Sequence, residues 1–153
     1  MEFPRNSHNA RGPNRQMKYL PNDQAPHVAL PHGDPSEIDR VVRLLLAAER
    51  PLLIVGDGVY WSDGAEALRQ VAEYLQIPVH SRRTARGAVS EDHPLAFTGG
   101  YRGELLRNAD VICIVGLRAT WLEEWFEPPE WGRTAAYIQV QEAAADVWPA
   151  LPT

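Results

Sequence analysis

The amino-acid sequence predicts an α/β domain in which helices cover both faces of a parallel sheet. Two runs, residues 52–55 and 111–115, are wholly apolar, which is typical of strands buried on both faces. Amphipathic segments lie between these runs, so strands and helices alternate along the chain. This alternation favours a three-layer architecture with a central parallel sheet.

Residues 1–33 differ from the rest of the chain and are predicted to be irregular. They contain five prolines, several asparagines and histidines, and no helical or strand period. Such a segment cannot bury enough apolar surface to offset the entropy lost on ordering. We expect a linker or tail, the first dozen residues of which could be a remnant of cloning, followed by one domain over residues 34–153. We favour a linker, which implies a further domain upstream.

The first helix is expected to begin directly after Asp34. Asp34 and Glu37 form the pattern of a capping box, with proline in the first helical position. Ile38 and Leu45 follow at helical spacing, so the helix is expected to continue to about Glu49.

A second helix is expected over residues 64–75, with Asp63 as its capping residue and Glu66 completing the cap. The remaining elements that the sequence predicts are strands at residues 77–80 and 136–140, a short helix at residues 102–108, and a lid-like or helical excursion over residues 121–131.

The composition excludes several classes of function. The net charge is −5, and residues 19–153 hold nineteen acidic against eleven basic residues, which disfavours nucleic-acid binding because that depends on neutralising phosphates. Charges and a proline interrupt the apolar stretch at residues 41–59, so we expect no membrane span. The start of the chain lacks the apolar core of a secretory signal. A single cysteine, Cys113, suits a cytoplasmic protein.

The carboxyl ends of the predicted strands are the expected place for a ligand. Residues 56–58, 81–84, 116–118 and 139–141 follow the strands, and they include glycines and arginines. Glycine lets a backbone approach a phosphate and arginine forms paired hydrogen bonds with it, so a nucleotide diphosphate would fit there. Glycine after a buried strand is also common as ordinary turn chemistry, and this interpretation stays open.

Two other classes of function remain as alternatives. Gly56 and Gly58 begin a dinucleotide-binding fingerprint, but Trp61 stands where its third glycine should be. Arg82 and Arg83 would suit the 2′-phosphate of NADP, so one alternative is a free-standing NADP-binding oxidoreductase domain. The other is a non-enzymatic nucleotide-binding scaffold.

Five segments together resemble a known family across residues 34–145. In chain order they are residues 49–58 (ERPLLIVGDG), 75–79 (LQIPV), 87–96 (GAVSEDHPLA), 108–118 (NADVICIVGLR) and 137–140 (YIQV). In content, order and spacing they resemble the central domain of thiamine-diphosphate-dependent enzymes such as acetohydroxyacid synthase, oxalyl-CoA decarboxylase and benzaldehyde lyase. The resemblance implies a Rossmann-like domain of the DHS-like NAD/FAD-binding type.

The resemblance also implies a larger parent enzyme that decarboxylates 2-oxo acids or joins the resulting carbanion to an acceptor. In that family a pyrimidine-binding domain carries the catalytic glutamate, and a diphosphate-binding domain binds thiamine diphosphate and Mg²⁺. Residues 56–58 match the start of the family's diphosphate motif, but its closing asparagine, an oxygen ligand for Mg²⁺, is missing before Asn108. We therefore expect this chain to be inert alone, beside sister domains in a homodimeric or homotetrameric parent.

Within that family the central domain holds FAD, ADP or nothing. The positions that match the family's ligand contacts, taken together with Asp57 of the first loop, are Gly56, Gly58, Arg82, Arg83, Thr84, Gly99, Gly100, Gly116 and Arg118. Where the flavin enzymes place acids that bind ribose hydroxyls, this chain has Thr120, Gln139 and Gln141. Glutamine binds ribose hydroxyls less well than a carboxylate does. A purely structural domain that binds no nucleotide therefore stands beside FAD and ADP binding as an expectation.

Other candidate residues favour structural roles. Cys113 lies within an apolar run and is expected to be a buried, inert thiol. His80 and His93 lack the spacing of metal ligands, and no metal site is expected. The aromatic cluster between Trp121 and Trp131 favours a local core over a ligand lid. A surface hidden by sister domains in the parent is expected to be exposed and to favour association.

Overall fold

The structure is a computed structural model that describes residues 32–151. The chain divides into two units, Met1–Leu30 and Pro31–Thr153, and every described residue belongs to the second. The predicted irregular segment over residues 1–33 therefore lies almost entirely outside the described residues.

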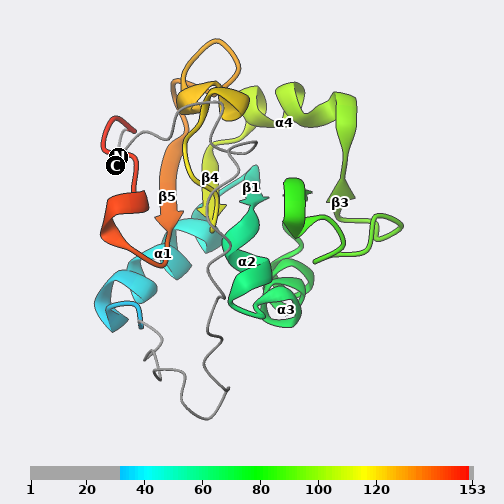
Figure 1. Ribbon diagram of the computed structural model, residues 1–153, viewed down its shortest axis with the longest axis vertical. Helices are drawn as coiled ribbons and strands as arrows, with labels where there is room; N and C mark the ends of the chain where they lie inside the picture. The colour runs from blue at the N-terminus through cyan, green and yellow to red at the C-terminus, as the bar shows by residue number, and fades with distance from the viewer. Residues whose placement is uncertain (1–31, 152–153) are drawn as a thin grey trace, which may run out of the picture. The chain divides into compact units, whose positions relative to one another are not determined.

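The second unit is built on a five-stranded sheet in the order β3-β2-β1-β4-β5 (Figure 1). Every neighbouring pair of strands is parallel. The register places Leu53 beside both Val79 and Cys113, so the two apolar runs are adjacent strands at the centre of the sheet. This arrangement confirms the predicted parallel α/β fold. The strands are β1 (Pro51–Val55), β2 (Val79–Ser81), β3 (Ala96–Phe97), β4 (Val111–Val115) and β5 (Ala136–Val140).

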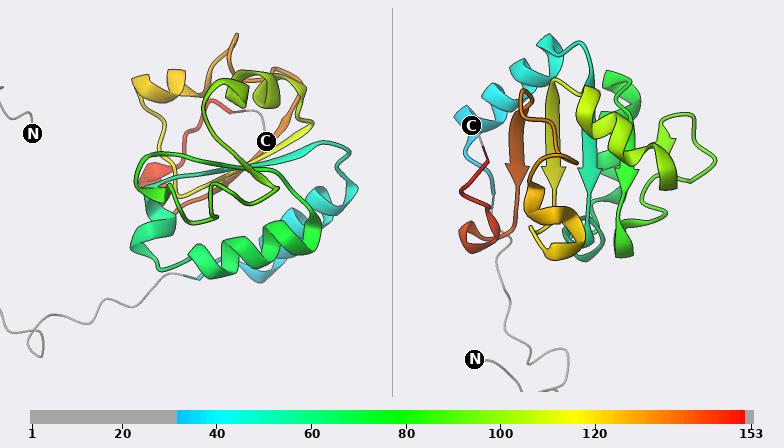
Figure 2. Two further views of the ribbon diagram at one scale, coloured as in Figure 1. Left: turned by 90° about the vertical axis from the view of Figure 1, so that its right-hand side faces the viewer. Right: turned by 90° about the horizontal axis from the view of Figure 1, so that it is seen from above.

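Helices cover both faces of the sheet, as Figure 2 shows. Helices α1 (Pro35–Ala47) and α3 (Ala65–Leu75) pack on one face, while α4 (Arg102–Asn108) and the 3-10 segment η5 (Trp121–Phe126) pack on the other. Four short helical segments follow strands β1, β2, β3 and β5, in that order: α2 (Asp57–Trp61), η3 (Arg83–Ala85), η4 (Gly99–Tyr101) and η6 (Ala144–Asp146).

Alternate residues of β1 contribute to two hydrophobic cores. Leu53 and Val55 join the core beneath α1 and α3, whereas Leu52 and Ile54 join the core beneath α4 and η5. All four side chains are buried. This double burial is the physical reason that the strand is apolar throughout rather than alternating.

The helix caps only partly follow the sequence prediction. The Asp34 side chain accepts a hydrogen bond from the Ser36 amide at 2.8 Å, as expected of a cap. Glu37 does not complete the box, because its carboxylate accepts from Arg40 Nε at 3.0 Å. Asp63 was the wrong capping residue for α3, since Gly64 occupies that position and Asp63 adopts a left-handed φ of 54°.

Candidate functional site at the carboxyl edge of the sheet

The residues predicted to bind a ligand gather at one edge of the sheet, formed by the carboxyl ends of its strands. Gly56, Arg82 and Gly116 each follow a strand directly, and the parallel pairing brings them to the same edge. Backbone hydrogen bonds join their loops: Gly56 N donates to Val115 O at 2.9 Å, and Arg82 N donates to Val55 O at 2.8 Å. This edge is where open parallel sheets bind ligands.

Three of the predicted glycines pack against each other. A Cβ added to Gly116 would lie 2.6 Å from Gly58 Cα, and one added to Gly56 would lie 2.7 Å from Gly116 O. The amide of Gly58 also donates to Gly116 O at 2.9 Å. Close packing of the β1 and β4 loops thus explains these glycines without any ligand.

Gly99 and Gly100 stand in a different environment. A Cβ added to either would meet nothing within 4 Å, so the space beside them is open. Gly99 also has a φ of +68°, which a residue with a side chain adopts only with strain. These two glycines leave room at the edge of the sheet where the β1 and β4 loops leave none.

Asp57 joins the β1 loop to the turn after β2. Its Oδ1 accepts a hydrogen bond from Thr84 Oγ1 at 2.7 Å. Two of the predicted site residues are therefore brought together, but they bind each other. The Asp57 carboxylate has a structural partner that a metal ion or a ligand would have to replace.

A buried ion pair at this edge joins Arg82 to Glu123. Arg82 Nε donates to both carboxylate oxygens at 3.0 Å, and Arg82 Nη2 donates to Oε1 at 2.8 Å. The Glu123 side chain is 0% exposed, although a carboxylate is rarely buried completely unless it is paired. Arg82 was predicted to face a phosphate, and the structure has it facing a carboxylate of the same chain.

Arg102 completes this buried cluster from helix α4. Its Nη2 donates to Glu123 Oε2 at 3.3 Å and to Glu124 Oε2 at 2.7 Å. Its guanidinium carbon lies 5.6 Å from the centre of the Trp131 ring, and its Nε is buried without a hydrogen-bond partner among the described residues. The sequence interpretation missed both Glu123 and Arg102. The available signal was a pair of acids within an aromatic run, which requires basic partners if the run is buried.

The other predicted arginines are more accessible. Arg83 makes only a 3.5 Å contact with Thr120 Oγ1 and a 3.9 Å approach to Glu123, while Arg118 lies 3.8 Å from Asp146. The side chains of Arg83 and Arg118 are 39% and 67% exposed. Both guanidinium groups can therefore meet an anion from solvent.

The two glutamines at the positions expected to bind ribose serve the backbone instead. Gln139 accepts from Trp148 N at 2.8 Å and donates to Trp148 O at 2.9 Å. Gln141 donates to Leu117 O at 2.6 Å. These amides hold the segment after β5 in place, a role that explains why they need not be acids.

His80 is a buried residue beside the same edge. Burial lowers the pKa of His80, and the nearby Arg82 and Arg102 charges act in the same direction. Its Nδ1 lies 2.8 Å from Phe97 O, which can only accept, so Nδ1 carries the proton. Its Nε2 is buried without a partner among the described residues. The geometry supports the structural role predicted for His80.

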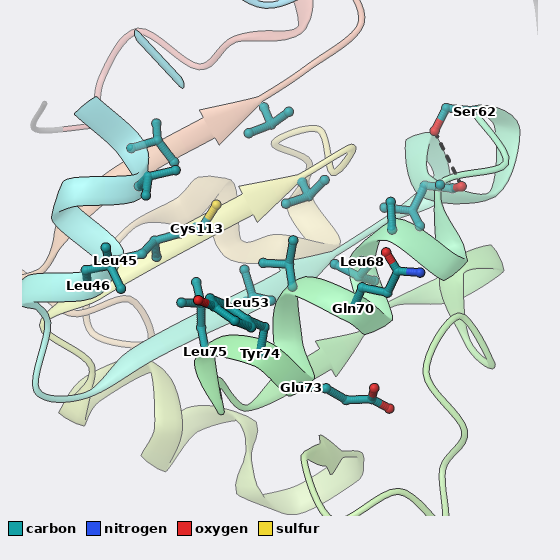
Figure 3. Close-up of a pocket in the computed structure, with 18 residues that line it drawn as sticks. Leu45, Leu46, Leu53, Ser62, Leu68, Gln70, Glu73, Tyr74, Leu75 and Cys113 are labelled. Carbon is teal, nitrogen blue, oxygen red and sulfur yellow. Dashed lines mark hydrogen bonds between the residues drawn. The ribbon is translucent and has the colours of Figure 1, made fainter. Parts of the chain in front are cut away.

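An apolar groove of about 1210 Å³ lies on a different part of the described residues, between α1 and α3 (Figure 3). Leu45 and Leu46 line it from α1, Leu68 and Tyr74 line it from α3, and Cys113 forms part of its floor. Leu46 is 64% exposed and Tyr74 is 86% exposed. These large apolar side chains form the kind of surface that the sequence interpretation expected sister domains to cover.

Cys113 is buried within the β4 strand, as predicted. Burial raises the pKa of its thiol to about 12, so the thiol stays protonated and unreactive near neutral pH. Within residues 32–151 no group of three or more His, Cys, Asp or Glu side chains is placed to hold a metal ion. In the same part of the chain no helix has the length and hydropathy needed to cross a membrane.

The aromatic cluster is divided between core and surface. Trp131 and Phe126 are buried at 1% and 3% exposure, with ring centres 4.6 Å apart. Trp131 Nε1 also donates to Glu123 O at 2.8 Å, which holds the η5 backbone in place. Trp121 remains 72% exposed, so the predicted local core contains only part of the cluster.

The parallel sheet and the helices on both of its faces define a Rossmann-like domain. Comparison with known protein families then identifies it: residues 38–148 match the model described as thiamine pyrophosphate enzyme, central domain. The chain belongs to this family, which confirms the resemblance found in the sequence.

Curated relatives are much longer than this chain. A 2-hydroxyacyl-CoA lyase of Oryza sativa is 30% identical over 128 residues, which cover 82% of this chain but 21% of that protein. Oxalyl-CoA decarboxylase of Escherichia coli is 40% identical over 88 residues, 58% of this chain and 15% of the relative. An acetolactate synthase large subunit of Mycobacterium tuberculosis is 41% identical over 87 residues, with shares of 57% and 15%.

A solved structure supports the fold. An X-ray structure described as a thiamin diphosphate-dependent enzyme from Mycobacterium smegmatis matches with a TM-score of 0.62 over 76% of this chain and 24% of the other. The sequence identity is 21%, so this match is evidence for the fold alone.

Proposed function

We propose that this chain is the structural central domain of a thiamine-diphosphate-dependent enzyme that decarboxylates 2-oxo acids or joins the resulting carbanion to an acceptor. The observation that carries the proposal is the family match over residues 38–148, combined with carboxylates that are already bound within the chain. Asp57 is bonded to Thr84 and Glu123 to Arg82, so neither is free to serve as a general base. We infer that the domain alone is catalytically inert.

Within residues 32–151, the loop that resembles the family's diphosphate motif does not fit thiamine diphosphate and Mg²⁺. The loop beginning Gly56-Asp57-Gly58 is closed against Gly116, and the Asp57 carboxylate is bonded to Thr84. Asn108, the next asparagine in the sequence, is at the opposite edge of the sheet, where its carbonyl accepts from Arg50 Nε at 2.8 Å. We therefore assign both groups to a sister diphosphate-binding domain of the parent, and the catalytic glutamate to a pyrimidine-binding domain.

A second role, nucleotide binding, is favoured by the accessible arginines of the carboxyl edge. Arg83 and Arg118 are exposed at this edge, and open space lies beside Gly99 and Gly100. A planar guanidinium forms paired hydrogen bonds with phosphate oxygens. We propose that FAD or ADP binds here through its diphosphate.

Equilibrium dialysis of the purified chain against FAD, ADP, CoA and NADP(H) tests the nucleotide role. We expect FAD or ADP to bind, and the double variant Arg83→Gln/Arg118→Gln to bind about ten-fold more weakly. Arg43→Gln, an exposed arginine of α1, is the matched control and should leave binding unchanged. Tight binding of NADP(H) alone would favour the oxidoreductase alternative, and no binding would leave a purely structural domain.

We further propose that the parent is a cytoplasmic homodimer or homotetramer assembled through its sister domains. The protonated, buried Cys113 suits a reducing compartment. The exposed apolar side chains of α1 and α3 suit a domain that packs against neighbours.

A further inference from the structure

The carboxyl edge concentrates positive charge around one buried carboxylate. Arg82 and Arg102 donate to Glu123, and Arg83 Nε approaches it to 3.9 Å. Glu124, bonded to Arg102, is the second acid of the cluster, so three guanidinium groups face two carboxylates. The cluster has a surplus positive charge, and Arg102 Nε remains buried without a partner among the described residues.

The segment that carries Glu123 is held in a strained conformation. Glu124, Trp125 and Phe126 have φ values of 48°, 54° and 58°, a left-handed region in which residues with a side chain are strained. Three consecutive residues of this kind persist only where the surrounding contacts are strong. The contacts available here are the ion pairs of Glu123 and the hydrogen bond from Trp131 Nε1 to Glu123 O.

We propose that Glu123 is a built-in counter-ion that closes an anion site formed by Arg82 and Arg102. A diphosphate group can bind Arg82 and Arg102 only when η5 moves and the Glu123 carboxylate leaves them. This inference rests on the proposed nucleotide role of the same edge and adds its regulation. In the closed state an incoming diphosphate meets Arg83 and Arg118 but is excluded from the buried pair.

The chemistry of the pair favours this exchange. Carboxylate and phosphate oxygens accept the same parallel N–H pairs from a guanidinium, so they compete for one position. Arg82 uses Nε and Nη2 on Glu123, which is the paired geometry that a phosphate would require. The two anions cannot both occupy this position, because like charges at contact distance repel strongly in a buried site.

The test compares the full chain with Glu123→Gln, using inorganic pyrophosphate as the probe at constant ionic strength. Glutamine keeps the size of the side chain and removes the charge, so pyrophosphate should bind about ten-fold more tightly than to the unmodified chain. In saturating probe the melting temperature of the variant should rise by about 4 °C more than that of the unmodified chain. Glu130→Gln is the matched control, because its carboxylate is exposed and lies 3.9 Å from Arg107.

Adding Arg82→Gln to the Glu123→Gln variant should abolish the tighter binding of pyrophosphate. An equal response to pyrophosphate in Glu123→Gln, Glu130→Gln and the unmodified chain would overturn the inference. If Glu123→Gln folds only with added anion, refolding in pyrophosphate but not in sodium chloride of equal ionic strength supports the inference, and failure in both overturns it. The proposed nucleotide role fails separately, if the unmodified chain binds neither FAD nor ADP.

Discussion

Replacing Gly116 by alanine tests the interpretation that the edge glycines pack against each other. A Cβ at this position would lie 2.6 Å from Gly58 Cα and 2.9 Å from the amide nitrogens of Gly58 and Val59. Those atoms are backbone, so the β1 loop would have to move as a whole. Gly116 also has a φ of +60°, which alanine adopts with strain.

The expected loss of stability combines two contributions. The left-handed backbone costs alanine about 1 kcal/mol, and forcing an extra methyl into a packed site costs about 1–3 kcal/mol. The sum is about 2–4 kcal/mol, which corresponds to a fall in melting temperature of about 10 °C for a domain of this size. Urea unfolding followed by tryptophan fluorescence measures the change.

Two other glycines of the same edge serve as controls. Gly99→Ala has a similar positive φ of +68° but nothing within 4 Å, so it should lose only about 1 kcal/mol. Gly100→Ala, also in open space, should change stability by about 0.5 kcal/mol or less. If Gly116→Ala were as stable as Gly99→Ala, the packing argument would be refuted.

Three further predictions concern single features of the described residues. Cys113 should react with a thiol reagent at pH 8 only after unfolding, because burial raises the pKa of its thiol to about 12. The free energy of unfolding should fall as the pH drops below about 6.5, because burial lowers the pKa of His80 and only the unfolded state takes up the proton. Urea midpoints at pH 7.5 and 5.5 should show a smaller fall in His80→Asn than in the unmodified chain. Light scattering should detect self-association that the double variant Leu46→Glu/Tyr74→Glu reduces, and a monomer at high concentration before substitution would contradict this.

The sequence patterns that depend on local periodicity predicted the fold well. The apolar runs at residues 52–55 and 111–115 became β1 and β4, and the short helix expected at residues 102–108 is α4. Each of these elements is determined by burial along its own few residues. Strand β3 escaped prediction because two residues show no period, and only pairing with β2 defines it.

The sequence indicated that the candidate residues gather at one edge of the sheet, but it did not indicate their contacts. Arg82 was found from its position after a strand, whereas its partner Glu123 lies 41 residues further along the chain. The acids within the aromatic run indicate that Glu123 needs a basic partner if the run is buried, but they do not indicate which arginine that partner is. The glycines were likewise interpreted as places where the backbone could approach a phosphate. The sequence does not show that Gly56 and Gly58 instead pack against Gly116 of another loop.

A turnover assay tests whether the proposed structural domain is inert without its sister domains. The purified chain is incubated with thiamine diphosphate, Mg²⁺ and pyruvate, and release of CO₂ is measured beside an intact acetolactate synthase. We expect no release above the cofactor blank at any protein concentration. Saturable release that scales with the concentration of this chain would contradict it.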